Sequence, residues 1–222
     1  MAKFAKDCVF FHAVLFFCHF STDFCISPCY PVGMIETVYT GPTSRRRWRT
    51  TMKTCAFTGH RPQHLPFGMN ENDERCVKLK EELKEQIINL IEAENVTHFI
   101  TGMALGVDLY AAEIVLDLKA RYPSITLERA IPCETQAVKW SMAQRERYYD
   151  IAVQCDKETM LQSHYSPDCM DKRNRYMVDQ ADILTVVWDG SPSGTGKTVR
   201  YAHQQGKPVI IINPVSLDVT QE

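Results

Sequence analysis

The sequence predicts a three-layer α/β fold, in which a mostly parallel β-sheet is covered by helices on both faces. Short apolar runs alternate with longer segments whose apolar residues recur at helical spacing, a pattern typical of parallel strands joined by crossover helices. Two of the runs, 183–188 (ILTVVW) and 209–212 (VIII), are continuously apolar. Such runs suit strands that are buried on both faces of a sheet.

The expected elements follow one another from residue 53 onward. Strands are expected at 54–58, 97–101, 125–131, 158–162, 183–188 and 209–212. The first helix carries the apolar residues between 83 and 91 at helical spacing, and Asn70 or Asn72 is expected to cap it. A third helix is expected to carry Ala137, Trp140 and Tyr148. The other helices are expected at 107–118, 168–180 and 195–205.

The first 51 residues differ from the rest of the chain. Their apolar run, 9–20, resembles the core of a signal peptide, but no clean cleavage site follows, and the run is too short for a confident membrane span. Residues 45–48 (RRRW) can be encoded by a purine-rich bacterial ribosome-binding sequence, three codons before Met52. The hypothesis is that residues 1–51 are a translated leader and that a single domain occupies 52–222. A disordered or membrane-associated arm is the alternative.

Composition limits the classes of partner. The chain has 222 residues and a net charge of −2, and the part from residue 52 onward is net acidic, which argues against a nucleic-acid partner. Four of the nine cysteines lie within the first 51 residues, and the other five include no C-x-x-C pair and no spacing typical of metal ligands. Scattered thiols suit a reducing compartment, so we expect a cytoplasmic protein with no metal site and no membrane partner. Homo-oligomerisation stays open.

The stretch 189–198 (DGSPSGTGKT) ends like a nucleotide-binding P-loop. In G-x-x-x-x-G-K-[ST], the leading glycine would be residue 191, which is Ser191, whereas Gly190 lies one residue too early. The 24 residues after Thr198 are also too few for the remainder of a P-loop core. Two alternatives are favoured over an ATPase: an ordinary loop between strand and helix, or a phosphate-binding loop of another α/β fold.

Candidate ligand contacts follow the strands, because open parallel sheets bind ligands beyond the carboxyl ends of their strands. After the first strand come Thr58, Gly59, His60 and Arg61. Glycine lets the backbone approach a ligand, and the guanidinium of Arg61 suits bidentate binding of a phosphate. A surface turn with a solvated arginine is the alternative.

The second strand leads through Gly102, Met103 and Gly106 into a helix. Free N–H groups and the helix dipole favour an anion at such a helix start. Asp108 lies in the first turn, where it either stabilises that turn or contacts a ribose hydroxyl. The spacing is not G-x-G-x-x-G, so an ordinary NAD fingerprint is absent.

Three further positions complete the candidate set. Glu134 follows the third strand, and capping of the next helix is favoured over a place in the cleft. Arg173 and Asn174 lie on the helix before the run 183–188, where a solvated and a packing residue are the alternative. Asp189 ends that run, and the loop 190–196 then offers a second nest of backbone N–H groups.

Four motifs occur in an order that resembles the YpsA-like branch of the SLOG superfamily. They are TGHRP at 58–62, GMALGVD at 102–108, RNRYMVD at 173–179 and GT at 194–195. The resemblance covers about residues 53–214. It implies a Rossmann-like sheet and a pocket for a nucleotide or an ADP-ribose-like ligand. The pocket contacts that the resemblance implies are Gly59, Arg61, Gly102, Gly106, Asp108, Gly194 and Thr195. With the residues at the strand ends, the full candidate set is Thr58, Gly59, His60, Arg61, Gly102, Met103, Gly106, Asp108, Glu134, Arg173, Asn174, Asp189, Gly194 and Thr195.

The superfamily also includes cytokinin-activating phosphoribohydrolases and a DNA-processing protein that binds single strands. The motif of the former resembles P-G-G-x-G-T-x-x-E, and its glutamate falls on Thr198 here. Asp108, Glu134 or Asp189 could replace that acid, but no catalytic residue is assigned. The favoured function is binding or sensing of a small nucleotide derivative. The alternatives are cleavage of an N-glycosidic or phosphate bond, and single-stranded DNA binding.

Overall fold

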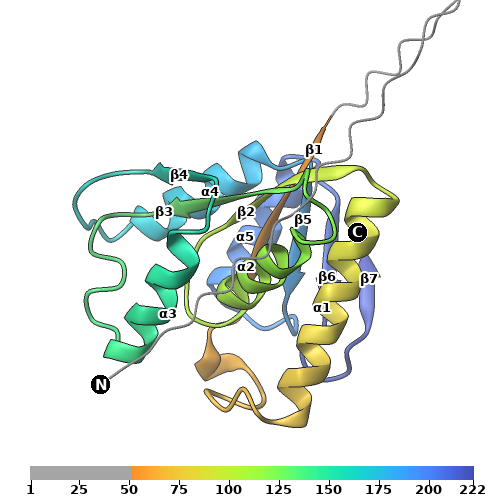
Figure 1. Cartoon of the computed structure of the whole chain (residues 1–222), viewed down its shortest axis with the longest axis horizontal. Coiled ribbons are helices and arrows are strands. Elements are labelled where there is room, and N and C mark those ends of the chain that lie inside the picture. The colour runs from red at the N-terminus through yellow and green to blue at the C-terminus, as the bar shows by residue number, and fades with distance from the viewer. Residues whose placement is uncertain (1–51) are drawn as a thin grey trace, which may run out of the picture. The chain divides into compact units, whose positions relative to one another are not determined.

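The computed structural model describes residues 52–222, so the expectation of a leader at 1–51 lies outside the described residues. Within this range the chain forms a seven-stranded sheet in the order β4-β3-β2-β1-β5-β6-β7 (Figure 1). All neighbouring strands are parallel except β6 and β7. The predicted mostly parallel, Rossmann-like α/β fold is therefore confirmed. The strands are β1 (Lys53–Gly59), β2 (Val96–Thr101), β3 (Thr126–Ile131), β4 (Lys157–Met160), β5 (Ile183–Val187), β6 (Val209–Ile212) and β7 (Val219–Gln221).

Helices cover both faces of the sheet (Figure 1). Helices α1, α2 and α3 pack on one face, and α4 and α5 pack on the other. Each face has its own cluster of buried apolar side chains, so the domain has two cores that share the sheet. The helices are α1 (Glu74–Glu92), α2 (Val107–Leu118), α3 (Met142–Ala152), α4 (Cys169–Gln180) and α5 (Gly194–Gln204), and a short 3₁₀ turn, η1, spans Pro62–His64.

Central strand β1 is covered on both faces. Cys55 and Phe57 lie in the core under α1 and α2, and Ala56 between them lies in the core under α4 and α5. The ring of Phe57 stacks on Phe99 of β2, with 5.7 Å between centroids. Alternate side chains of a strand point to opposite faces, so apolar residues at consecutive positions indicate a strand with two covered faces.

The start of α1 differs from the expectation. Asp73, not Asn70 or Asn72, is the N-cap, and its carboxylate accepts a hydrogen bond from the N–H of Arg75 at 2.9 Å. The side chain of Asn70 accepts instead from the N–H of Asn72 at 3.2 Å, which forms a turn before the helix. Both residue types serve caps and turns, so their positions alone do not separate the two uses.

Helix α3 also begins later than expected. Ser141 is its N-cap, and Ser141 and Gln144 form a reciprocal capping box. Ala137 and Trp140 lie before the helix, in turns that follow β3. Trp140 packs edge-on against Tyr148 of α3, with 5.5 Å between ring centroids. This contact explains why the two aromatic residues looked like one helical face.

The strand order reverses direction beside β1. The chain moves from β1 outward through β2, β3 and β4, then returns through α4 to β5 on the other side of β1. The carboxyl ends of β1 and β5 are thus neighbours whose following loops run to different faces of the sheet, a position where such folds bind ligands. No helix within residues 52–222 is long and apolar enough to cross a membrane.

Candidate functional site

A cavity of about 310 Å³ lies at the carboxyl ends of β1 and β5. Four separate parts of the sequence meet there: the end of β1 with η1, the loop and first turn around α2, the face of α4, and the loop that enters α5. The lining residues are Thr58, Gly59, His60, Arg61, His64, Ala104, Asp108, Met170, Arg173, Asn174, Pro192, Ser193, Gly194 and Thr195.

Two glycines of this region serve packing between backbone segments. A Cβ atom on Gly59 would lie 2.6 Å from the Cβ of Val107, so glycine lets the start of α2 approach β1. Gly106 has a φ of 94°, and a Cβ there would lie 2.8 Å from the carbonyl oxygen of His60. Together they bring the first turn of α2 against the loop after β1.

Gly102 has a different role, because it makes room for a buried ion pair. A Cβ on Gly102 would overlap the guanidinium of Arg173 and would lie 2.7 Å from Oδ2 of Asp108. Nη1 of Arg173 donates to the carbonyl oxygen of Gly102 and lies 3.6 Å from Oδ2 of Asp108. The two charged side chains are only 5% and 7% exposed.

The buried carboxylate also occupies the start of α2. Oδ2 of Asp108 accepts a hydrogen bond from the N–H of Ala104 at 3.2 Å, in the loop that precedes the helix. Burial raises the pKa of the Asp108 carboxyl, and the charge of Arg173 opposes this shift. An anion that approached the N-terminus of α2 would therefore meet a carboxyl group of the protein itself.

The start of α5 is open by comparison. The hydroxyl of Ser193 caps the helix by accepting from the N–H of Gly196 at 3.2 Å. The N–H groups of Gly194 and Thr195 have no acceptor within the described part of the chain, and both residues line the cavity. A Cβ on Gly194 would meet no atom within 4 Å. This helix start can therefore receive an anion from the cavity.

Thr198 lies beneath this helix start and is buried. Its hydroxyl donates to the carbonyl oxygen of Gly194 at 3.1 Å and accepts from Nδ2 of Asn174 at 3.0 Å. The position that carries glutamate in the resembling phosphoribohydrolases is thus part of the contact between α4 and α5. Among the residues that line the cavity, Asp108 is the single carboxylate.

His60 and Asp189 tie the loop after β1 to the loop after β5. Nε2 of the buried His60 lies 2.8 Å from Oδ1 of Asp189. Hydrogen bonds from Ser191, together with the contact to His60, hold the pKa of the Asp189 carboxyl well below its usual range. Asp189 does not itself line the cavity but holds His60, which does.

The charges around the cavity favour an anionic ligand. Arg61 is exposed at the rim and Arg173 is buried in the wall, and Asp108 offsets one of the two positive charges. The rings of His60 and His64 add further donors or acceptors, with 5.9 Å between their centroids. A phosphate entering this cavity would meet net positive charge, forked N–H donors and the positive end of a helix dipole.

Not every candidate residue reaches the cavity. Gly102, Met103, Gly106, Glu134 and Asp189 do not line it. Met103 is fully buried with a φ of 55°, and Glu134 is exposed and does not cap α3. Among the lining residues that sequence reasoning missed, Met170 lies three and four positions before Arg173 and Asn174 on the same helix, so helical spacing could have found it. The others are His64, Ala104, Pro192 and Ser193.

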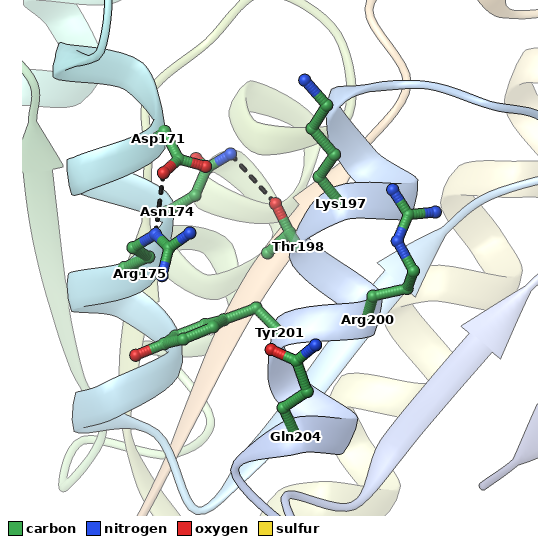
Figure 2. A pocket seen from close by; sticks show the side chains of 8 residues that line it. All are labelled: Asp171, Asn174, Arg175, Lys197, Thr198, Arg200, Tyr201 and Gln204. Carbon is green, nitrogen blue, oxygen red and sulfur yellow. Dashed lines mark hydrogen bonds and ion pairs between the residues drawn. The ribbon is translucent and has the colours of Figure 1, made fainter.

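A smaller groove of about 200 Å³ lies between α4 and α5 (Figure 2). Figure 2 shows Lys197 and Arg200 on the α5 side, and Arg175 paired with Asp171 on α4 at 2.7 Å. Lys197 lines this groove and not the cavity at the strand ends, so it does not hold the place of a P-loop lysine. The groove is lined by Asp171, Asn174, Arg175, Lys197, Thr198, Arg200, Tyr201 and Gln204.

Metal-ligating side chains do not gather at either place. In the range 52–222, no group of three or more His, Cys, Asp or Glu residues is arranged to hold a metal ion. The five cysteines of this range are free thiols.

Comparison with known proteins identifies relatives over nearly the whole domain. Residues 55–216 match the model of the YpsA family, described as the YspA SLOG family. The chain is 28% identical to the UPF0398 protein YpsA of Bacillus subtilis (strain 168) over 178 residues, which cover 77% of this chain and 98% of that protein. It is 32% identical to the UPF0398 protein BH1768 of Halalkalibacterium halodurans over 179 residues, which cover 77% and 94%.

Solved structures of DNA processing protein A are similar at a lower level. The protein from Helicobacter pylori, described by its single-stranded DNA binding mode, gives a TM-score of 0.49 at 18% identity over 72% of this chain. The protein from Streptococcus pneumoniae gives a TM-score of 0.49 at 17% identity over 75% of this chain. The chain spans 64% and 52% of these two proteins.

Proposed function

The chain belongs to the YpsA SLOG family, and we propose that it binds a nucleotide-derived ligand, such as ADP-ribose or a nucleotide, by its phosphate. The observation that carries this proposal is the open start of α5, where Gly194 and Thr195 face the same cavity as Arg61. Free N–H groups at a helix N-terminus and a forked guanidinium are the donors that phosphate oxygens prefer in proteins. The helix dipole contributes about 0.3–1 kcal/mol to such an anion, and more where the site is partly buried.

The rest of the cavity offers contacts for a sugar. Asn174 and the carboxyl group of Asp108 also line the cavity, and both side chains can hydrogen-bond hydroxyl groups. Asp108 is held by Arg173, and Thr198 stands where the resembling hydrolases carry an acid. The proposal is therefore binding or sensing in which the ligand is released unchanged.

Calorimetric titration of the full chain with ADP-ribose, NAD, AMP and ATP, followed by mass spectrometry of each mixture, tests the proposal. Saturable binding of at least one ligand, recovered intact, is expected. Arg61→Ala should weaken that binding about tenfold or more, as loss of charge-assisted hydrogen bonds does. Gly194→Val should weaken it at least as much while leaving stability unchanged, because the added side chain meets no protein atom near its Cβ.

Lys197→Ala is the matched control. Lys197 carries the same charge as Arg61 and lies three residues from Gly194, but it lines the neighbouring groove. Its removal should leave the affinity within about twofold. A larger loss in Lys197→Ala than in Arg61→Ala would contradict the proposal and favour a P-loop-like site. Consumption of a ligand would assign a hydrolase instead. Binding of a single-stranded oligonucleotide that weakens steeply with salt, with none of the four ligands bound, would favour the DNA alternative.

A further inference from the structure

A second, more apolar cavity of about 480 Å³ lies beside the candidate site. It is formed by the turns between β3 and α3 and by the segment that enters α4. Two large apolar side chains are left exposed at this place, Val138 at 63% and Tyr165 at 66%. The lining residues are Cys133, Thr135, Gln136, Val138, Lys139, Trp140, Tyr165 and Met170.

The apolar cavity borders the candidate site, and two features link them. Met170, in the first turn of α4, lines both cavities. Nε2 of Gln136 donates to the carbonyl oxygens of Gly102 at 3.1 Å and Met103 at 2.7 Å, and Ala104, the next residue of that loop, lines the candidate site. Gln136 of the apolar cavity is thus hydrogen-bonded to the loop after β2, and that loop contributes Ala104 to the candidate site.

The distance between the apolar cavity and the candidate site allows one small molecule to occupy both. The candidate site lies at the ends of β1 and β5, and the apolar cavity lies beyond the end of β3, two strands from β1. The start of α5 follows β5, which lies three strands from β3. Neighbouring strands are about 4.8 Å apart, so the two places are separated by roughly 10–15 Å, the scale of the length of an extended nucleotide.

The side chains of the apolar cavity suit a flat aromatic group. Trp140 is partly buried and its ring is held edge-on by Tyr148, so it presents a fixed surface. Tyr165 is exposed, and Met170 offers a polarisable thioether. Tryptophan and tyrosine rings stack on nucleobases, and sulfur makes favourable contacts with aromatic rings. No acidic or basic side chain other than Lys139 lines this cavity within the described range.

We propose that the apolar cavity binds the base of the nucleotide-derived ligand whose phosphate is held at the start of α5. This inference rests on the proposed function and sharpens it: the ligand carries an aromatic base, and Trp140 and Tyr165 contribute to its selection over a sugar phosphate that has none.

The test compares AMP with ribose 5-phosphate, which has the same phosphate and sugar but no base. Stacking of one base contributes about 1–3 kcal/mol, so AMP should bind roughly 5- to 150-fold more tightly to the full chain. Tyr165→Ala should reduce this preference about fivefold or more and leave the affinity for ribose 5-phosphate unchanged. Tyr149→Ala is the matched control, because Tyr149 is 58% exposed and lines neither cavity.

Trp140→Leu is the stronger variant, and unfolding in urea shows whether it keeps its fold. Tyr165→Ala removes an exposed side chain, so its result does not depend on that check. Equal affinities for AMP and ribose 5-phosphate would overturn the base site while leaving the proposed function standing. A preference for AMP that Tyr165→Ala and a folded Trp140→Leu both leave unchanged would also overturn it. If neither AMP nor ribose 5-phosphate binds, and ADP-ribose, NAD and ATP do not bind either, the proposed function and this inference would both be overturned.

Discussion

Helices α2 and α5 begin at the same edge of the sheet, each after a strand and a glycine-containing loop, but their N-termini are used differently. At α2, the carboxylate of Asp108 accepts from the loop N–H of Ala104, and Arg173 neutralises it from α4. At α5, Ser193 is the single side-chain cap, and the N–H groups of Gly194 and Thr195, which line the cavity, have no acceptor within the described residues. The first site is filled by the protein, and the second is left for a ligand.

The glycines of the two loops differ in the same sense. Gly102 is required because the guanidinium of Arg173 lies where its side chain would be, whereas a side chain on Gly194 would enter empty space. A glycine before a helix therefore does not by itself mark a phosphate site. Whether the helix start is open to a phosphate depends on whether other side chains of the protein, such as the ion pair of Asp108 and Arg173, already occupy it.

Gly102→Ala is expected to give the largest effect. The added methyl group would overlap the buried guanidinium of Arg173, so the ion pair with Asp108 must move or break. Breaking a buried ion pair costs about 3–5 kcal/mol of stability. Urea unfolding of Gly102→Ala should show a loss of this size, and Gly194→Ala should stay within about 0.5 kcal/mol of the parent protein. Equal losses in the two variants would remove the distinction between the two loops.

The sequence predicted most of the architecture, because burial in the core requires apolar residues at regular positions along the strands and helices. Strands β5 and β6 are buried at every position, and all of their residues except Thr185 are apolar, so the run itself indicates the strand. The predicted start of α3 was wrong, because Trp140 and Tyr148 have the spacing of a helical repeat although Trp140 lies in a turn and packs on Tyr148. The capping pair Ser141 and Gln144 was readable as S-x-x-Q and would have placed that start correctly.

The site was predictable as a place more than as a set of contacts. Strand ends and helical spacing indicate which loops gather at the edge of the sheet, and nine candidate residues line the cavity. The sequence could not show that Arg173 donates to the carbonyl oxygen of Gly102, 71 residues away. Nor could it show that Glu134, three residues after the end of β3, is exposed to solvent. Such details depend on how two layers pack, which no local pattern encodes.

Substitutions of Ser193 should test the difference between the starts of α2 and α5, with changes in stability smaller than that of Gly102→Ala. Ser193→Ala removes the N-cap acceptor of α5 and should cost about 1 kcal/mol of stability. Ser193→Asp keeps an acceptor and should stay within about 0.5 kcal/mol of the parent protein, but it places a carboxylate at this helix start, as Asp108 does at α2. The affinity for AMP or ADP-ribose should then fall tenfold or more in Ser193→Asp and less in Ser193→Ala. Unfolding in urea and calorimetric titration measure the two effects, and equal affinities in both variants would contradict an anion site at α5.

The smallest expected effect concerns the pH dependence of stability, where the carboxyl groups of the two regions should act with opposite signs. Hydrogen bonds from Ser191 lower the pKa of Asp189 in the folded protein. Its contribution is present above the unfolded pKa of about 3.9 and is lost as pH falls below that value. Asp189→Asn should therefore flatten the acid side of the stability curve.

Burial raises the pKa of Asp108, so the folded protein takes up a proton there at a higher pH than the unfolded chain does. The contribution of this group is greatest below about pH 3.9 and is lost as pH rises through the folded pKa. The difference in unfolding free energy between the parent protein and Asp108→Asn should then grow as pH falls from about 7 to about 4, whereas the difference for Asp189→Asn should shrink below about 4. Urea unfolding across this range measures both slopes. Slopes of the same sign would mean that the charge of Arg173 outweighs burial and lowers the pKa of Asp108 in the folded protein. The start of α2 would then hold a full negative charge, which repels phosphate.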